Sequence, residues 1–460
     1  MDLYQDLRSL FDDSIVTIEH SELIKYGQDE TEDFVFEPDV VVKPKTVEQL
    51  SQLMAYCNKV KIPVTPRGAG TGLSGASLPI HKGVLLSMEH FNSIIEIDEA
   101  NMQATVESGV INHNLREAVE ARNLFYPPDP ASKGSCYIGG NVAHNSGGPK
   151  AVKYGVTKDY ILNLEVVLPN GEVIWTGSNT LKNSTGYNLT QLFIGSEGSL
   201  GVVTKVVVRL LSKPKHNLLL WANVPKAITA CLAVSDIMKS GVVPSGMELM
   251  EKKGIDLACQ YLNLPNPVSH DCEAALMIEV DGDHMDQLYS GCESISNTLG
   301  THQIENVLFA DSGEQKESWW QIRRSIGEVV KAHSTYKEQD TVVKRSHLAT
   351  LMAGVKEIEA KFGFESVCYG HAGDGNLHVN ILKNDLTDAQ WQGPHLEEGI
   401  REIFRLCKQL GGTISGEHGI GYVQKKYMNE VMSETHLDLM RGVKKAFDPN
   451  GIMNPGKIFD

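Results

Sequence analysis

Three glycine-dense segments constrain the fold of this chain more than any other feature. They are residues 67–75 (RGAGTGLSG), 134–148 (GSCYIGGNVAHNSGG) and 194–201 (IGSEGSLG). Glycine lets successive backbone N–H groups converge on an anion without obstruction by a Cβ atom. A single loop of this kind is explained equally well as a tight turn. Three of them before residue 202 indicate an extended ligand held along its length, as a dinucleotide would be.

The first glycine segment follows a predicted strand–helix–strand unit, with strands at 36–42 and 62–65 and a helix at 46–59. Its spacing, G-x-G-x-x-G, matches the fingerprint of Rossmann dinucleotide-binding folds. That fingerprint must open a helix, whereas here ASLP follows and Pro79 interrupts any helix. We therefore favour a non-helical nest, to which Arg67, Thr71 and Ser74 can add donors.

The length of the chain, 460 residues, is too great for one core and predicts two domains. Pro214 marks a boundary, so we expect a cofactor domain over 1–215, a second domain over 216–415 and a C-terminal return over 416–460 that packs on the first. Between 216 and 410, strand-like runs alternate with helical periodicity, and some runs form hairpins. This pattern predicts an antiparallel α+β domain.

The charge and cysteine patterns exclude several classes of function. A formal net charge of −16 disfavours nucleic-acid binding. The 8 cysteines include no CxxC pair, which disfavours a disulfide framework and an iron–sulfur cluster. The N-terminus lacks the basic and apolar regions of a signal peptide, and no run of 18 apolar residues exists. We expect a cytoplasmic protein without a transmembrane segment, attached to a membrane only through a partner.

The segment YGHAGDGNLHVN in the last quarter carries two histidines, His371 and His378, on either side of a turn-forming run. Apolar stretches flank the run, so it predicts two strands joined by a tight hairpin. Folding the strands back on each other would bring the two imidazoles together. On a strand, Asn380 shares the face of His378 and can bind the same ligand.

The segment SGEHGIGY adds Glu417 and His418. Imidazole and carboxylate ligands suit a divalent metal, and His371, His378 and Glu417 together leave coordination positions open, as a catalytic site requires. Zinc fits this set best, and manganese or iron can also be bound by it. His418 then has no metal role and is the candidate general base.

Taken together, these segments resemble a known family. PRGAGTGLSG, PPDPASKGSCYIGGNVAHNSGG and FIGSEGSLGVVT resemble the FAD-binding segments of the vanillyl-alcohol-oxidase superfamily. YGHAGDGNLHVN, SGEHGIG and FDPNGIMNPGK resemble its branch of FAD-linked 2-hydroxy-acid dehydrogenases. That branch includes the flavin subunit of glycolate oxidase, D-lactate dehydrogenases and D-2-hydroxyglutarate dehydrogenase. The resemblance implies a two-subdomain FAD-binding domain and an antiparallel α/β substrate (cap) domain.

The resemblance also assigns residues to FAD. The predicted cofactor-binding residues are Pro66, Arg67, Gly68, Ala69, Gly70, Thr71, Gly72, Ser74, Pro130, Ser132, Gly139, Gly140, Asn141, Gly147, Glu197, Gly198, Gly201, Val202 and Asn454. Some relatives tether the flavin to a histidine of the first loop. Positions 68–75 contain none, so we expect non-covalent FAD. His144 in AHNSGG is interpreted as a structural histidine.

On the substrate side, Arg323 and Lys337 match family positions that bind the substrate carboxylate, and the family agrees with the metal set above. A surface ion pair is the alternative explanation for each of these two cations. A threonine of the hydroxyglutarate enzymes is replaced by Gly327, which weakens the case for a five-carbon diacid.

The resulting hypothesis is FAD-dependent oxidation of a D-2-hydroxy acid, with D-lactate or glycolate ahead of D-2-hydroxyglutarate. Because the chain has no iron–sulfur or haem motif, an electron-transfer flavoprotein, an iron–sulfur subunit or a quinone would accept the electrons. An oxygen-using oxidase is the enzymatic alternative. An ether-lipid synthase with the same FAD cradle, and a non-enzymatic subunit of a larger complex, are the other two alternatives.

Overall fold

The computed structural model describes residues 2–31 and 34–459, which form two compact units. The first comprises Met1–Gly147, Val156–Lys213 and Glu417–Asp460. The second comprises Gly148–Gly155 and Pro214–Gly416. The short segment Gly148–Gly155, which contains helix α6 (Ala151–Tyr154), thus belongs to the second unit although we expected it in the first domain. Within the described residues, no helix combines the length and apolar character needed to cross a membrane.

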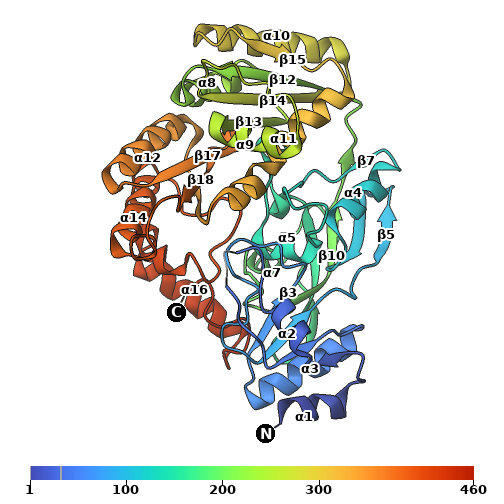
Figure 1. Ribbon diagram of the computed structural model, residues 1–460. Helices are drawn as coiled ribbons and strands as arrows, with labels where there is room; N and C mark the ends of the chain where they lie inside the picture. Colours follow the sequence, from blue (N-terminus) through green and yellow to red (C-terminus); the bar gives the residue numbers. More distant parts are fainter. Residues whose placement is uncertain (1, 32–33, 460) are drawn as a thin grey trace. The chain divides into compact units, whose positions relative to one another are not determined.

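The first unit begins with the predicted strand–helix–strand arrangement. Its strands β2 (Val40–Val42), β4 (Val84–Ser87) and β3 (Val64–Arg67) are parallel neighbours, and β1 (Val16–Thr17) joins the edge antiparallel to β2. Helix α3 (Val47–Val60) begins where the Thr46 side chain accepts a hydrogen bond from the N–H of Gln49. The leucines of α3 pack on the sheet in an apolar core that also takes in Ile452 and Met453. The C-terminal tail therefore packs back onto this unit (Figure 1).

A second sheet of the same unit is antiparallel and has the strand order β5-β6-β10-β8-β9. Its strands are β5 (Ile94–Asp98), β6 (Gln103–Glu107), β10 (Val202–Arg209), β8 (Ile161–Val167) and β9 (Val173–Trp175). The remaining elements of the unit are α1 (Leu3–Leu10), α2 (His20–Tyr26), α4 (Asn112–Glu120), β7 (Leu124–Phe125), α5 (Ile138–His144), α7 (Leu189–Phe193), β11 (Leu211–Ser212), α15 (Met428–Val431) and α16 (Glu434–Phe447).

The second unit is built on one antiparallel sheet with the order β15-β12-β14-β13-β17-β18-β16. Its strands are β15 (Val307–Phe309), β12 (His216–Val224), β14 (Ala274–Gly282), β13 (Gly246–Glu251), β17 (Glu365–His371), β18 (Asn376–Leu382) and β16 (Tyr336–Val342). This arrangement is the antiparallel α+β domain that the sequence predicts.

Two helices, α9 (Lys252–Leu262) and α11 (Gly313–His333), pack together on this sheet (Figure 1). Their apolar side chains share a core with alternate residues of the strands, and Trp221 and Trp319 meet there with ring centroids 5.6 Å apart. The other helices are α8 (Ala227–Lys239), α10 (Met285–Thr301), α12 (Leu348–Phe362), α13 (Asp388–Trp391) and α14 (Pro394–Gln409). Helices α8 and α10 contact β12 and β14, and α12 packs between α8 and α14.

The sequence did not predict β13, β16 or α9. Strand β16 has the sequence YKEQDTV, in which polar residues conceal the strand pattern, although Gln339, Asp340 and Thr341 are buried. Helix α9 follows β13 directly, without a glycine or proline to mark the change. Helix α5 forms inside the second glycine segment, which the sequence indicated as a loop.

Candidate functional site

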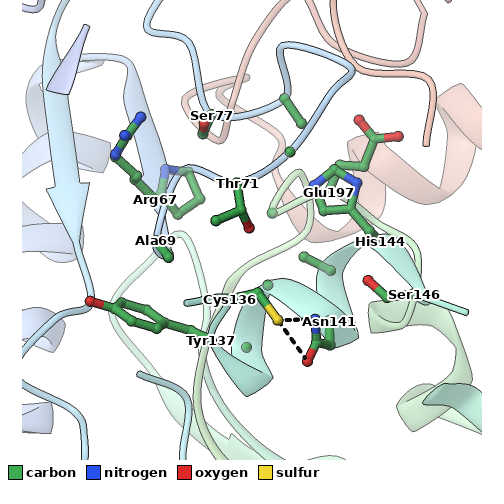
Figure 2. Close-up of a pocket in the computed structure, with 18 of the residues that line it drawn as sticks. Arg67, Ala69, Thr71, Ser77, Cys136, Tyr137, Asn141, His144, Ser146 and Glu197 are labelled. Atoms are coloured by element: carbon green, nitrogen blue, oxygen red, sulfur yellow. Dashed lines mark hydrogen bonds between the residues drawn. The ribbon is translucent and has the colours of Figure 1, made fainter. Parts of the chain in front are cut away.

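A cavity in the first unit is lined by all three glycine segments (Figure 2). Of the predicted cofactor residues, all except Ser74, Gly147 and Asn454 line it. The phenol ring of Tyr137 and the imidazole of His144 stand at opposite sides in this view. Cys136 also lines the cavity and shares hydrogen-bonding contacts with Asn141. The remaining lining residues include Leu73, Ala76, Ser77, Met88, Ser108, Ala131, Ala143, Ser146, Phe193, Ser196 and Val203.

The backbone of the first loop is suited to an anion. In the part of the chain that the structure describes, none of the N–H groups of residues 68–72 donates to a protein acceptor. A run of free, convergent N–H groups is the arrangement of a phosphate nest. Gly140 lines the same cavity, and a Cβ atom added to it would meet nothing within 4 Å. The backbone at Gly140 thus borders open space that a side chain would fill, so the cavity fits a large phosphorylated ligand.

Arg67 was predicted to contribute to phosphate binding, and its guanidinium is already hydrogen-bonded within the protein. Its guanidinium donates to the carbonyl oxygen of Gln28 at 2.7 Å, and desolvation by burial lowers its pKa. The ring of Tyr26 lies 5.7 Å from the guanidinium carbon. The side chain therefore ties the chain at residues 26–28 to the first loop, and its action on a phosphate stays a prediction.

The three predicted residues that do not line the cavity contact the segments that form it. The carbonyl oxygen of Ser74 accepts hydrogen bonds from the N–H groups of Tyr422 and Val423. The side-chain amide of Asn454 donates to the carbonyl oxygens of Ala76 and Glu197, so it joins the first and third glycine segments. Gly147 lies so close to Glu417 that an added Cβ would be 2.8 Å from Oε2.

Glu197 holds the segment that carries Glu417 and His418. Its two carboxylate oxygens accept hydrogen bonds of 2.7 Å from the N–H groups of Ile420 and Gly421. Burial raises the pKa of this carboxyl, although these bonds and nearby cations act against the shift. Lys457, which was not predicted from the sequence, is buried nearby and donates to the carbonyl oxygen of Leu78. Its place in the motif FDPNGIMNPGK was the available signal.

Glu417 and His418 line the cavity of the first unit together with the glycine loops. Oε1 of Glu417 lies 3.9 Å from Nε2 of His418. The imidazole of His144 donates from Nδ1 to the carbonyl oxygen of His418 at 2.9 Å, which agrees with its interpretation as a structural histidine. The candidate base and one candidate metal ligand are therefore adjacent at the ligand cavity.

The predicted histidine hairpin is confirmed in the second unit. Strands β17 and β18 are antiparallel, and His371 and His378 lie with ring centroids 5.5 Å apart at an interplanar angle of 83°. Both side chains are buried. The sheet register explains the pairing, because Tyr369 stands directly opposite His378 and His371 is two residues further along the same face.

Buried or half-buried carboxylates surround the two imidazoles. Glu248 of β13 stands directly opposite His371, and its oxygens lie 2.9 and 3.0 Å from Nδ1 of that ring. Nδ1 of His378 lies 3.4 Å from Glu338 and 3.6 Å from Asp340, both on β16. At His371 the Nδ1–H is hydrogen-bonded to the carboxylate, so this ring presents Nε2 as a ligand atom, the common arrangement behind metal-binding histidines.

Arg323 reaches the same face from helix α11. Its Nε donates to Glu248 at 2.7 Å, its guanidinium carbon lies 5.0 Å from the centre of the Tyr369 ring, and the residue is 5% exposed. One terminal nitrogen, Nη2, is buried without a hydrogen-bond partner in the described residues. A buried guanidinium nitrogen with a free donor fits a carboxylate ligand. Burial alone would raise the pKa of Glu248, but His371 and Arg323 outweigh it and lower that pKa.

Asn380 and Lys337 differ in whether their polar atoms are already hydrogen-bonded within the described residues. Asn380 is fully buried on β18, its amide nitrogen lies 3.4 Å from the Tyr369 hydroxyl, and its Oδ1 has no partner in the described part of the chain. Lys337 donates to the carbonyl oxygen of Trp391 at 2.8 Å and lies over its ring, so its amine already has a role. Tyr369 was missed, although it begins the YGH motif, and burial raises its pKa well above the usual value.

Two models of known protein families match separate parts of the chain. Residues 38–177 match the model of an FAD binding domain. Residues 213–458 match the C-terminal domain of FAD linked oxidases. The glycine cavity thus lies in a chain with an FAD-binding domain, and the histidine hairpin lies within the second match.

Similar sequences extend over nearly the whole chain. Glycolate oxidase subunit GlcD of Bacillus subtilis (strain 168) is 37% identical over 450 residues, 98% of this chain and 94% of that protein. A D-lactate dehydrogenase of Anaerostipes hadrus is 34% identical and covers 95% of this chain and 92% of its own length. A D-2-hydroxyglutarate dehydrogenase of Stutzerimonas stutzeri (strain A1501) is 31% identical, with coverages of 99% and 98%.

Among solved structures, p-cresol methylhydroxylase with bound substrate aligns with a TM-score of 0.80 at 18% identity, over 100% of this chain and 96% of that one. At that identity the likeness concerns the fold. It confirms the predicted vanillyl-alcohol-oxidase type of fold.

Proposed function

Because the chain belongs to the family of FAD-linked oxidases, we propose that it oxidises a D-2-hydroxy acid, with D-lactate or glycolate as the favoured substrates. The observation that supports this proposal most directly is the buried polar cluster of the second unit. There, within the described residues, Arg323 and Asn380 keep an unpaired donor and an unpaired acceptor beside His371 and His378. A chain that only stored flavin would gain nothing from burying these groups.

FAD supplies the hydride acceptor of the reaction when it is bound. The free N–H groups of residues 68–72 and the open space at Gly140 support binding of its phosphates and rings in the glycine cavity. Positions 68–75 contain no histidine, which supports dissociable rather than covalently tethered flavin. The backbone N–H groups of the chain would hold the cofactor, and the hydrogen bonds donated by Asn454 would keep the glycine loops in place.

The substrate carboxylate is assigned to Arg323. Its Nε is occupied by Glu248, so the guanidinium is fixed in orientation while Nη2 keeps a donor for one carboxylate oxygen. Asn380 lies on the same strand face as His378 and keeps, within the described residues, an unpaired acceptor Oδ1 for the same bound ligand. Lys337 is a weaker candidate for carboxylate binding, because its amine is bonded to Trp391.

A divalent metal is assigned to His371, His378 and Glu417. The imidazole pair and its carboxylate partners in the second unit support the two nitrogen ligands. Glu417 directly follows Gly416, whose N–H donates to the carbonyl oxygen of Asp340 beside His378. Such an ion would supply a Lewis acid for the substrate oxygens, and zinc, manganese and iron are all compatible with the ligand set.

His418 is assigned as the base that takes the hydroxyl proton. A histidine is suited to this task because it titrates near neutral pH. The hydrogen bond from His144 fixes its main chain, and the Glu197 carboxylate fixes the following segment by accepting from the N–H groups of Ile420 and Gly421. The main chain of the loop that carries the proposed base is therefore held in place.

Substrate size follows from Gly327 and Tyr369. A Cβ atom at Gly327 would lie 3.1 Å from the Tyr369 hydroxyl, so Tyr369 takes up room that a side chain at 327 would need. That crowding supports a small acid and leaves D-2-hydroxyglutarate as the alternative substrate. The electrons would pass to a separate acceptor, an electron-transfer flavoprotein, an iron–sulfur subunit or a quinone. We expect a cytoplasmic enzyme, held at a membrane only through such a partner.

The test is an anaerobic panel of D- and L-lactate, glycolate, malate and 2-hydroxyglutarate, with flavin absorbance as the signal. We expect bleaching by D-lactate or glycolate, loss of that bleaching after chelation, and retained FAD. Bleaching by none of the acids, with FAD fully bound, would refute the proposal. Admission of air then tests the oxidase alternative, because rapid reoxidation with peroxide formation identifies it.

Two substitutions separate the roles of the histidines. His378→Ala should abolish turnover and metal retention together, whereas His418→Ala should abolish turnover and keep the metal. His395→Ala is the matched control, because His395 packs on Phe362 in the second unit away from the hairpin. Equal metal loss in both test variants would contradict the division of roles.

A further inference from the structure

Glu248 is the one carboxylate in the described residues whose hydrogen bonds join a predicted metal ligand, His371, to a predicted substrate residue, Arg323. Its side chain is fully buried on β13. One oxygen lies 2.9 Å from Nδ1 of His371, and the other lies 3.0 Å from that nitrogen and 2.7 Å from Nε of Arg323. Neither the sequence pattern nor the proposed reaction assigns a role to this residue.

The sheet register explains this position. Glu248 and His371 are directly opposite each other on β13 and β17, and opposite residues of an antiparallel pair project to the same face. Arg323 comes from α11, the helix packed over that face. The carboxylate thus sits where strand and helix meet, at the polar end of an otherwise apolar core.

The hydrogen bonds of Glu248 fix the tautomer of His371 and the orientation of Arg323. Since a carboxylate only accepts hydrogen bonds, His371 must carry its proton on Nδ1 and presents the Nε2 lone pair. Arg323 is held through Nε, which leaves Nη2 as a free donor with a fixed direction. The same charge therefore sets the tautomer of one group and the orientation of the other.

We propose that Glu248 is a positioning residue that couples metal binding at His371 to substrate-carboxylate binding at Arg323. This inference rests on the proposed function of both residues. Changing the carboxylate must alter two measurable affinities together, because each partner loses its fixed acceptor. A carboxylate with a purely structural role would alter stability and leave the affinities of the folded protein unchanged.

Glu248→Gln is the direct test, because glutamine keeps the size and one acceptor oxygen. Its amide nitrogen can donate to Nδ1 of His371 and so favour the tautomer that protonates Nε2. We expect the affinity of the FAD-loaded protein for Zn²⁺ to fall about 10- to 100-fold, the usual effect of losing an outer-shell partner. The KM for the active hydroxy acid should rise at the same time, and FAD content should stay unchanged.

Glu279→Gln provides the matched control. Glu279 is a buried carboxylate on the adjacent strand β14, where it pairs with Lys150 and accepts a hydrogen bond from the indole of Trp320. Within the described residues its side-chain hydrogen bonds go to Lys150, Asn217 and Trp320, and none reaches His371 or Arg323. Its variant should lose stability and keep both affinities. If Glu248→Gln also keeps both, or loses only one, the coupling is refuted.

Arg323→Gln gives a second route that does not depend on the folding of the Glu248 variant. Glu248 would then face His371 alone, so Zn²⁺ should bind about fivefold or more tightly, the lower end of measured couplings between sites. Unchanged or weaker Zn²⁺ binding would overturn the inference. A wild-type protein that neither retains a metal nor is reduced by any hydroxy acid would instead refute the proposed function itself, and the inference with it.

Discussion

The imidazole of His144 is hydrogen-bonded to the main chain of His418: Nδ1 donates to the carbonyl oxygen across 2.9 Å, although the two residues are 274 positions apart. His144 ends helix α5, whose glycines line the ligand cavity, and His418 is the proposed base. The FAD loops and the base are thus joined by a single side chain. This contact lies wholly within the first unit.

Replacing His144 by alanine should slow turnover without releasing FAD. A hydrogen bond of this kind contributes about 1 kcal/mol net, so losing it and loosening the His418 loop should lower kcat by about fivefold to tenfold. FAD content should persist, because the free N–H groups of the first loop are untouched. Steady-state kinetics and the ratio of flavin to protein check this. His113→Ala, on the exposed side of α4, should change neither quantity.

Gly147→Ala should impair metal retention. The added Cβ would lie 2.8 Å from Oε2 of Glu417, so the carboxylate must move from its position. We expect less bound metal, determined by elemental analysis, and lower turnover with normal FAD content. Full metal retention in this variant would argue against Glu417 as a ligand.

Gly140→Ala should weaken FAD binding and leave metal binding unchanged. Its Cβ would project into the open space of the cavity, where it competes with the cofactor and not with a protein group. FAD should dissociate more readily, while metal content stays normal. Gly134→Ala is the control, because its Cβ also meets nothing but Gly134 does not line the cavity. Equal FAD affinity in the two variants would contradict the proposed cofactor position.

The sequence predicted those parts of the site in which local spacing determines geometry. The glycine loops and the hairpin of His371 and His378 are of this kind, because a turn with flanking apolar runs is a short-range signal. Asn380 was placed correctly on the face of His378 by the alternation of a strand.

The missed residues depend on long-range pairing. Glu248 is 123 residues from His371 in sequence, and only the register of β13 with β17 brings them together. Strand β16 was missed because its buried polar residues, among them Asp340, serve the hairpin instead of an apolar core. Lys457 depends in the same way on a tail that returns to β3.

Because of Lys457, the free energy of unfolding should increase with pH in the alkaline range. Burial lowers the pKa of its amine from 10.5 to about 8, against the attraction of Glu197 and Asp29. Between these two pH values the unfolded chain binds a proton that the folded chain does not. The free energy of unfolding therefore rises with pH in this window, by about 1.4 kcal/mol per unit for this group.

The measurement is urea unfolding of the wild type and of Lys457→Met, below pH 8 and near pH 10. The difference in unfolding free energy should shift toward the wild type as the pH rises, because the cost of burying the charged amine disappears once it is neutral. The exposed-lysine variant Lys239→Met should keep a constant difference from the wild type over the same range. A constant difference for Lys457→Met as well would mean that the amine titrates near 10.5 and that its burial costs nothing.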